Sequence, residues 1–308
     1  MPLRLGTRAS ALARWQAEWV AARLTALGHQ VELVPITTTG DAQQTDRIGN
    51  LGSPGVFTKE LQRALLDERI DLAVHSLKDL PTDVVEGLIL AAVPERESPL
   101  DVLVCQHATS LDSLSVGARV GTGSLRRRAQ LLHRRADLRM LEIRGNVDTR
   151  LRKLADGEFD ALVLAEAGLK RLGLTEHIAA VLNVDVMLPA VGQGALGIET
   201  RADDATTLAA VRMLDHAASH QAVLAERSLL AALLGGCLAP VGALARTNAA
   251  GKLTLSAAVL SFDGQQRIAV LGESSATAAD AIALGQTVAS QLNAQGAAEL
   301  IAASRSAG

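Results

Sequence analysis

The stretch VPERESPLDVLV (residues 93–104) indicates the domain organisation when it is compared with MLPAVGQGALGIE (residues 187–199). Each stretch carries proline or glycine and interrupts a regular alternation of strand-like and helix-like segments. The segment between them repeats the alternation that precedes the first of them. The two stretches therefore predict paired crossings, in which the chain leaves one α/β domain, builds a second and returns to the first.

The segment before residue 93 alternates between short apolar strands and amphipathic helices. The expected elements are strands at residues 3–8, 29–36 and 71–77 and helices at residues 10–28 and 58–69. In the first helix, Leu12, Trp15, Trp19 and Ala22 are predicted to share the buried face, with Gly28 as the C-terminal cap.

The same rhythm returns between the two crossings, whereas the end of the chain differs. Helices are expected there at residues 124–135, 146–157 and 166–173, each after a short strand. From about residue 216, a helix precedes strands at 239–246, 251–261 and 265–273 and a last helix at 278–294. The expected domains are residues 1–94 with 195–214, residues 100–189, and residues 217–308, the third being α+β with an antiparallel sheet.

Composition limits the classes of function. The chain has 308 residues, is 48% hydrophobic and has a net charge of −3, which favours globular domains over a basic nucleic-acid binder. Two distant cysteines predict neither a disulfide framework nor a zinc site. The uncharged run from Ser228 to Ala245 is interrupted by Gly235, Gly236 and Pro240, which favours a buried helix, turn and strand over a membrane span. We therefore expect a cytosolic protein.

Arginines gather at a helix start in the second domain. Ser124 is predicted to cap the helix that carries Arg126 and Arg127. Because helix N-termini already bear partial positive charge, arginines there are unfavourable unless an anion is present. Further arginines follow other strands, so the ligand expected at these strand ends is a polyanion. This set of strand-end arginines comprises Arg126, Arg127, Arg144, Arg150 and Arg171. We interpret Arg128, Arg134, Arg135, Arg152 and Lys153 as solvated.

The first domain places other polar residues at strand ends. His75, Ser76, Lys78 and Asp79 come at the end of a buried strand, where an acid beside a lysine handles protons or stabilises a cation. An ordinary surface Lys–Asp pair is the alternative interpretation. Arg8 and Ser10 follow the first strand in an equivalent position. His216 and His220 are spaced for one helix face but lack a third metal ligand, so a role at a helix start is favoured. Cys105 is interpreted as a core residue of a strand.

The stretch LLGGCLAP (residues 233–240) places Cys237 after two glycines, which a sulfur approached by a bulky group would need. Together with it, a series of motifs covers nearly the whole chain and resembles the porphobilinogen deaminase (hydroxymethylbilane synthase) family. The motifs that carry the resemblance are GTRASALARWQA, FTKELQRALL, DLAVHSLKDLP, VGTGSLRRRAQL, IRGNVDTRL, AGLKRLG, LPAVGQGALGIE and AERSLLAALLGGCLAPVGA.

The resemblance implies a fold and a reaction. Two domains would resemble the halves of periplasmic binding proteins, and the third would carry Cys237, which holds a covalent dipyrromethane cofactor through a thioether. The reaction would join four porphobilinogen molecules head to tail, with loss of ammonia at each step, to give linear hydroxymethylbilane. Each pyrrole carries an acetate and a propionate, which would supply the expected polyanion. The family also implies a monomer.

The resemblance also assigns residues. Asp79 would be the catalytic acid, which binds pyrrole N–H groups and stabilises the cation that forms. The cofactor would be held by Cys237, Ser76, Lys78, Thr122, Ser124, Arg126 and Arg127. The substrate would be bound by Arg8, Ser10, Arg144, Arg150, Arg171 and Gln193, with Phe57 as a shield. No metal is implied. The loop before the helix at 58–69 departs from the family, since Pro54 stands where a lysine is common.

Two other functions remain open from the residues alone. A binding protein for a small polycarboxylate or phosphorylated ligand would suit two domains, but would give Cys237 and Asp79 no task. An RNA-binding protein would use the arginines, but the acidic net charge and the scarcity of aromatic residues argue against it.

Overall fold

The computed structural model describes residues 1–37, 58–233 and 239–307. The chain divides into two compact units. Unit 1 comprises Met1–Glu97 and Ala195–His220, and unit 2 comprises Ser98–Gly194 and Gln221–Gly308. The chain thus leaves unit 1, returns once and leaves again, while the finer division into three domains stays a prediction.

Unit 1 is built on a five-stranded sheet of order β2-β1-β3-β10-β4. Its strands are β1 (Leu3–Thr7), β2 (Val31–Pro35), β3 (Leu72–Ser76), β4 (Leu88–Ala92) and β10 (Leu196–Arg201). Strand β1 pairs in parallel with β2 and β3, whereas β10 runs antiparallel to β3 and β4. One face is covered by α1 (Ala11–Ala26) and α7 (Ala205–Arg212), and the other by α3 (Lys59–Leu66).

Unit 2 contains a second five-stranded sheet, of order β7-β6-β8-β5-β9. Its strands are β5 (Asp101–Cys105), β6 (Arg119–Gly121), β7 (Arg139–Leu141), β8 (Ala161–Ala165) and β9 (Ala180–Leu182). Strand β6 pairs in parallel with β7 and β8, and β5 runs antiparallel to β8 and β9. Helix α4 (Leu125–Arg134) covers one face, and α5 (Val147–Ala155) and α6 (Glu166–Leu172) cover the other. The two five-stranded sheets therefore have the same strand order and directions.

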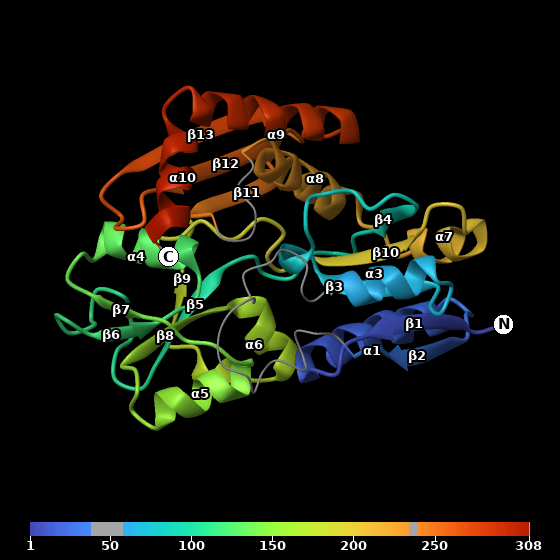
Figure 1. Ribbon diagram of the computed structural model, residues 1–308, viewed down its shortest axis with the longest axis horizontal. Helices are drawn as coiled ribbons and strands as arrows, with labels where there is room; N and C mark the ends of the chain where they lie inside the picture. Colours follow the sequence, from blue (N-terminus) through green and yellow to red (C-terminus); the bar gives the residue numbers. More distant parts are fainter. Residues whose placement is uncertain (38–57, 234–238, 308) are drawn as a thin grey trace. The chain divides into compact units, whose positions relative to one another are not determined.

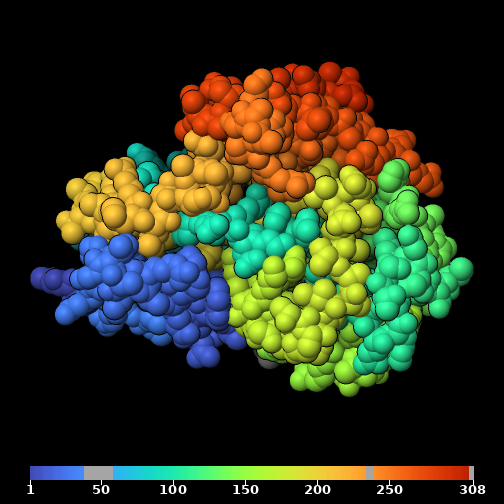
Figure 2. Space-filling view, turned by 180° about the vertical axis from the view of Figure 1, so that it is seen from behind, coloured from blue at the N-terminus to red at the C-terminus, as the bar shows by residue number. Residues whose placement is uncertain are grey.

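The end of the chain, coloured orange to red in Figure 1 and Figure 2, forms a three-stranded antiparallel sheet. Its elements are β11 (Val241–Thr247), β12 (Leu253–Leu260) and β13 (Arg267–Ser274), with α8 (Ala217–Ala232), α9 (Ala278–Asn293) and α10 (Ala297–Ala307). Residues of these three helices pack on one face, and Ala129 of α4 packs on the other beside Leu244 and Ala258. The predicted fold class, two α/β sheets followed by an α+β segment, is confirmed.

Some predictions of local structure were wrong. The chain has a further helix, α10, beyond the one expected to be last. The predicted face of α1 is also wrong, because Ala22 is exposed and Leu12 and both tryptophans are only half-buried. Its buried residues are Gln16, Ala17, Val20 and Leu24. Apolar side chains lie on most sides of this helix, so the sequence pattern could not identify which face is buried. The small side chain of Ala17 lies against the sheet, whereas the guanidinium of Arg23 lies 3.3 Å from the ring centroid of Trp19.

Other predictions were confirmed. The C-terminal cap of α1 is Leu27, one residue before the predicted Gly28, and Gly28 follows with φ of 90°, a conformation that favours glycine at a helix end. His216 precedes α8, and its Nδ1 lies 2.9 Å from Ser219 Oγ, as expected for a helix start. None of the described helices is both long and apolar enough to span a membrane.

Candidate active site

The residues singled out from the sequence lie in two groups, one in each unit. In unit 1 they lie at or after the ends of β1 and β3, and in unit 2 they follow β6, β7 and β8, except for Gln193, which precedes β10. These five strands belong to parallel pairs, and the residues come after their carboxyl ends. In α/β sheets this is the edge at which ligands bind.

Asp79 stands on a one-turn 3-10 helix, η2 (Leu77–Asp79), directly after β3. Leu77 and Leu80 are 1% and 6% exposed and anchor this turn in the core. The residues between them face outward, so Lys78 is half-buried and Asp79 is exposed. Within the described ranges no hydrogen bond or ion pair engages the Asp79 carboxylate. Its position thus leaves the carboxylate accessible to a ligand.

The neighbours of this turn have fixed positions. Ser76 Oγ accepts a hydrogen bond from Gln16 Nε2 of α1 at 2.8 Å, and Gln16 is itself buried. Ser10 is the N-cap of α1, and its Oγ accepts from the Ala13 backbone N–H at 3.4 Å. Arg8 is half-buried between β1 and this cap. The polar residues of unit 1 are therefore held at the ends of strands β1 and β3 and at the start of helix α1.

Behind the turn lies a buried pair of titratable groups that the sequence analysis did not find. His75 Nε2 lies 3.1 Å from Glu199 Oε2, and Gln62 Nε2 donates to Glu199 Oε1 at 3.0 Å. All three residues are less than 9% exposed. This contact joins β3, β10 and α3, and so it stiffens the strand that ends at Ser76.

In unit 2, Arg126 and Arg127 form ion pairs with one buried carboxylate, that of Asp101. Arg126 Nη1 lies 2.7 Å from Asp101 Oδ2, and Arg127 Nη2 lies 2.8 Å from Oδ1. Arg127 Nη1 also donates to the Val163 carbonyl, and Arg126 Nη1 to that of Leu188. The arginines are 4% and 6% exposed and Asp101 is 0% exposed. Burial alone would raise the pKa of Asp101, but the two guanidinium charges outweigh it and hold that pKa well below its usual range.

Arginines at a helix start were predicted to need an anion, and the buried Asp101 carboxylate is one such anion within the protein itself. Asp101 opens the otherwise apolar strand β5, and the acid at the start of DVLV was the available signal. One negative charge faces two positive charges, so the group keeps a net positive charge. Arg126 Nε is buried and has no hydrogen-bond partner in the described part of the chain. The group can therefore still bind an anion.

Other residues of unit 2 surround the start of α4. Ser124 is its N-cap, as predicted, and accepts from the Arg127 backbone N–H. Thr122 Oγ1 accepts from the Ser124 backbone N–H at 3.1 Å. Gln193, which is fully buried, donates to Asp101 Oδ1 at 3.0 Å and to the Pro99 carbonyl at 2.7 Å.

The remaining predicted arginines differ in burial. Arg171 is buried, and its Nη2 donates to the Gly194 carbonyl at 2.6 Å. Arg150 is half-buried and donates to the Gly145 carbonyl, while Arg144 is exposed and paired with Glu142. Gly145 has φ of 110°, which lets the chain turn tightly between these two arginines.

The interpretation of Arg128 as a solvated residue was wrong. Its guanidinium lies 4.3 Å from the ring centroid of Phe262, in the turn between β12 and β13. Its Nε is buried without a hydrogen-bond partner in the described ranges. The pattern of the sequence could not reveal this contact, since Phe262 is distant along the chain.

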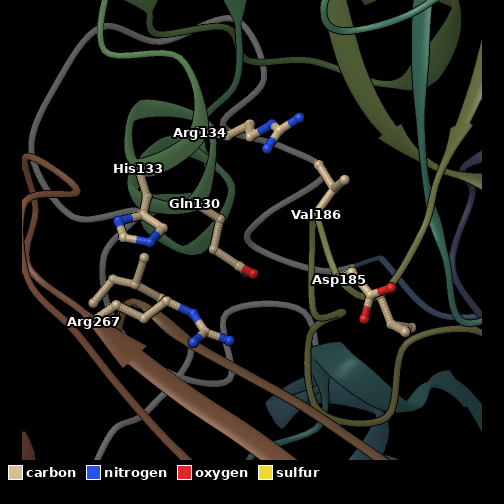
Figure 3. A pocket seen from close by; sticks show the side chains of 8 residues that line it. Gln130, His133, Arg134, Asp185, Val186 and Arg267 are labelled. Carbon is tan, nitrogen blue, oxygen red and sulfur yellow. The ribbon is translucent and has the colours of Figure 1, made fainter.

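A separate cavity of about 360 Å³ lies beside α4 (Figure 3). Gln130, His133 and Arg134 line it from α4, and Arg267 lines it from β13. None of the predicted site residues lines it. Among the described residues, no group of three or more His, Cys, Asp or Glu side chains could hold a metal ion.

Three predictions fall outside the described residues. Cys237, Phe57 and Pro54 lie in the segments 234–238 and 38–57, which the structure does not describe. Cys105, the other cysteine, is half-buried in β5, and burial raises the pKa of its thiol.

The fold and site define an α/β protein that presents charge-paired arginines and an exposed carboxylate at strand ends. The family model "Porphobilinogen deaminase, dipyromethane cofactor binding domain" matches residues 3–209, and "Porphobilinogen deaminase, C-terminal domain" matches residues 220–294. A porphobilinogen deaminase of Desulforudis audaxviator is 51% identical over 97% of this chain and 96% of that protein. One of Syntrophotalea carbinolica is 50% identical over 98% and 95%. A methionine binding protein, MetQ, is similar at a TM-score of 0.44 and 16% identity over 71% of this chain and 89% of that chain.

The chain belongs to the porphobilinogen deaminase family. Its reaction is the head-to-tail condensation of four porphobilinogen molecules, with release of ammonia, to linear hydroxymethylbilane. The cofactor of this family is dipyrromethane, so the alternative of a non-enzymatic binding protein is not favoured.

Proposed function

We propose that this condensation uses one exposed carboxylate for the chemistry and the strand-end arginines for binding. Asp79 assists the departure of ammonia from porphobilinogen, and the arginines bind the acetate and propionate groups of the pyrroles. One observation carries the proposal: Arg126 and Arg127 share the single carboxylate of Asp101 and keep a net positive charge. A surplus charge among buried groups is costly unless an anion compensates it.

The residues of unit 2 fit a cofactor that bears carboxylates. Arg126 Nε is a buried donor without a partner in the described ranges, which suits an additional acceptor. When bound, the dipyrromethane supplies the pyrrole end to which the first substrate is joined. Its carboxylates are assigned to a set of polar and basic side chains: Ser76, Lys78, Thr122, Ser124, Arg126 and Arg127.

We assign the covalent bond to Cys237, on the strength of the GGCLAP motif. The thiolate sulfur is a soft nucleophile, and a thioether to carbon does not hydrolyse readily. The two residues before Cys237 in the sequence are glycines, which carry no side chain that would hinder a bulky group. Cys105 is not a competitor, because its thiol is half-buried, donates to the Ala108 carbonyl and has a raised pKa.

Asp79 is assigned the catalytic role. As the amine leaves as ammonia, positive charge develops on the substrate, and a nearby ionised carboxylate stabilises that charge. The same carboxylate accepts hydrogen bonds from pyrrole N–H groups. The accessible position of Asp79 on its short turn supports this role, since its oxygens are not engaged within the described ranges.

The growing chain gains carboxylates at every addition, so binding requires more cations than the cofactor alone does. Guanidinium groups suit this task because they bind carboxylates through two parallel hydrogen bonds. The residues assigned to substrate are Arg8, Ser10, Arg144, Arg150, Arg171 and Gln193, with Phe57 as a shield of the cofactor.

Intact mass under denaturing conditions tests the anchor. The purified protein should be heavier than its sequence by one dipyrromethane, and Cys237→Ala should lack the excess. Cys105→Ala is the matched control and should keep it. An active protein of unmodified mass, or an excess that persists in Cys237→Ala, would exclude Cys237 as the anchor.

The location and assembly of the protein are also proposals. We propose a cytoplasmic monomer of three domains, with boundaries at residues 1–94 with 195–214, 100–189 and 217–308, and with neither nucleic acid nor membrane as a partner. Light scattering of the purified protein tests the monomer, and limited proteolysis at the boundaries tests the domains.

A further inference from the structure

Asp101 contacts three of the residues assigned to ligand binding. Its Oδ2 accepts from Arg126 Nη1 at 2.7 Å. Its Oδ1 accepts from Arg127 Nε at 3.0 Å, from Arg127 Nη2 at 2.8 Å and from Gln193 Nε2 at 3.0 Å. Four donors from three residues thus converge on one carboxylate that is 0% exposed.

The location of Asp101 explains why it reaches all three residues. It is the first residue of β5 and pairs with Ala165, the last residue of β8. This register brings a residue of an antiparallel strand to the edge where the parallel strands end. Helix α4 brings Arg126 and Arg127 to the same edge, and Gln193 reaches it from the segment before β10.

The charges indicate what the carboxylate does. Arg126 and Arg127 are neighbours in sequence, and each would repel the other in a buried site. Asp101 lies between them and fixes both guanidinium planes through charged hydrogen bonds. It neutralises one positive charge of two, so the group keeps a net positive charge that can attract an anion.

We propose that Asp101 is a positioning residue for the condensation: it holds Arg126, Arg127 and Gln193 in one arrangement that binds carboxylates of the pyrrole chain. This inference rests on the roles proposed above for Arg126 and Arg127. Asp101 itself touches neither substrate nor cofactor and acts through the arginines.

Two variants of Asp101 test the proposal. Asp101→Asn keeps the size but removes the charge. Asp101→Glu keeps the charge, so that the net charge of the group is unchanged, but moves the carboxylate by one methylene. Asp160→Asn is the matched control, because Asp160 also forms a two-point ion pair, with Arg119 on β6, but at the exposed side of the same sheet.

The readouts separate positioning from stability. Intact mass gives the fraction of folded protein that carries the cofactor, and steady-state kinetics give KM and kcat for that fraction. We expect kcat/KM per folded protein to fall at least about tenfold in both Asp101 variants, through a smaller loaded fraction and a higher KM, because uniform binding is lost. Asp160→Asn should match the unmodified protein.

The contrary results are equally clear. If folded Asp101→Asn or Asp101→Glu keeps its loaded fraction and KM within twofold of the unmodified protein, Asp101 has only a structural role. If neither variant folds, the assignment as a positioning residue also fails. Arg126→Leu and Arg127→Leu separate the two proposals: unchanged loading and KM in these variants would overturn the assigned arginine roles themselves, whereas a failure confined to Asp101 would leave them standing.

Discussion

The two five-stranded sheets have the same strand order and directions, yet they place different residues at equivalent positions. In unit 1, the antiparallel strand β10 begins with Leu196, which pairs with Ser76 at the end of β3. In unit 2, the antiparallel strand β5 begins with Asp101, which pairs with Ala165 at the end of β8. A carboxylate is thus buried at this edge of one sheet and replaced by leucine in the other.

The carboxylate that unit 1 presents, Asp79, comes instead from the exposed turn after β3. One sheet topology therefore serves two purposes. A buried carboxylate compensated by arginines makes a rigid anchor for anions, whereas an exposed one is accessible to the reacting atoms. The consequences of substitution should therefore differ: changes in unit 2 should affect cofactor loading and stability, and changes at Asp79 should affect turnover.

The largest effect is expected for Asp79→Asn. Turnover should fall about 100-fold to 1,000-fold, the size of effect seen when a group that stabilises transition-state charge is removed. The fold should be unchanged because Asp79 is exposed. Hydroxymethylbilane formation and the far-ultraviolet circular dichroism spectrum are the measurements. Asp83→Asn, an exposed carboxylate four residues later, should keep normal rates. Normal rates in Asp79→Asn as well would remove Asp79 from its role.

Arg126→Leu tests the other half of the comparison, the buried ion pairs of unit 2. The substitution leaves Asp101 Oδ2 without its donor from Arg126, and the Leu188 carbonyl keeps only its hydrogen bond from Gln130 Nε2, so the free energy of unfolding should fall by about 2 kcal/mol. The cofactor-loaded fraction should fall as well. Urea unfolding and intact mass measure the two effects, and Arg134→Leu, an exposed residue of the same helix, should show neither. Full cofactor loading in Arg126→Leu would contradict the proposed role of Arg126 in holding the cofactor.

Glu226→Gln tests whether another buried carboxylate of unit 2 contributes to the stability of the fold rather than to turnover. Glu226 of α8 is 0% exposed and accepts from the backbone N–H groups of Gly192 at 2.7 Å and Ala245 at 2.9 Å. An amide nitrogen facing one of these donors should lower the free energy of unfolding by about 1–3 kcal/mol. The loaded protein should keep its kcat. Glu299→Gln, on the exposed side of α10, is the control for urea unfolding. A loss of kcat without loss of stability would oppose this interpretation.

The smallest effect is expected in the pH dependence of stability. The pKa of Asp101 is lower in the folded chain than its ordinary value of 3.8, so its ionisation stabilises the fold above pH 3.8. Below that pH the unfolded chain binds the proton more readily, and this stabilisation is lost as the pH falls toward the folded pKa. Between pH 5 and pH 3, Asp101→Asn should lose about 1 kcal/mol less stability than the unmodified protein. Equal losses in urea titrations would show that Asp101 contributes nothing to the acid sensitivity.

The sequence predicted those features that depend on local patterns. The alternation of strands and helices, the cap at Ser124 and the turn at Gly28 follow from neighbouring residues, and each was confirmed. The motifs also led to the family and the reaction. Local chemistry was sufficient for these features because each depends on residues a few positions apart.

Long-range pairings could not be predicted. The carboxylate of Asp101, which pairs with Arg126 and Arg127, lies 25 residues or more away along the chain. The guanidinium of Arg128 contacts Phe262, which lies in the turn between two strands of another sheet. The pattern of α1 failed for a different reason, since alanine on most sides leaves several faces equally apolar. The strand order within each sheet likewise could not be predicted. The strands β5 and β10 belong to the two crossing segments, and the sequence pattern does not specify which strands they pair with.

The central claim is that anchoring and chemistry are separate tasks of different residues. Intact mass of Asp79→Asn before and after mixing with porphobilinogen tests it most directly. Cofactor assembly has hours during expression, so a variant slowed about 100-fold to 1,000-fold should still be loaded. We predict that Asp79→Asn carries one dipyrromethane and gains no further pyrrole units on the timescale of normal turnover. Extension at the normal rate would contradict the account, as would a folded Asp79→Asn protein that carries no dipyrromethane.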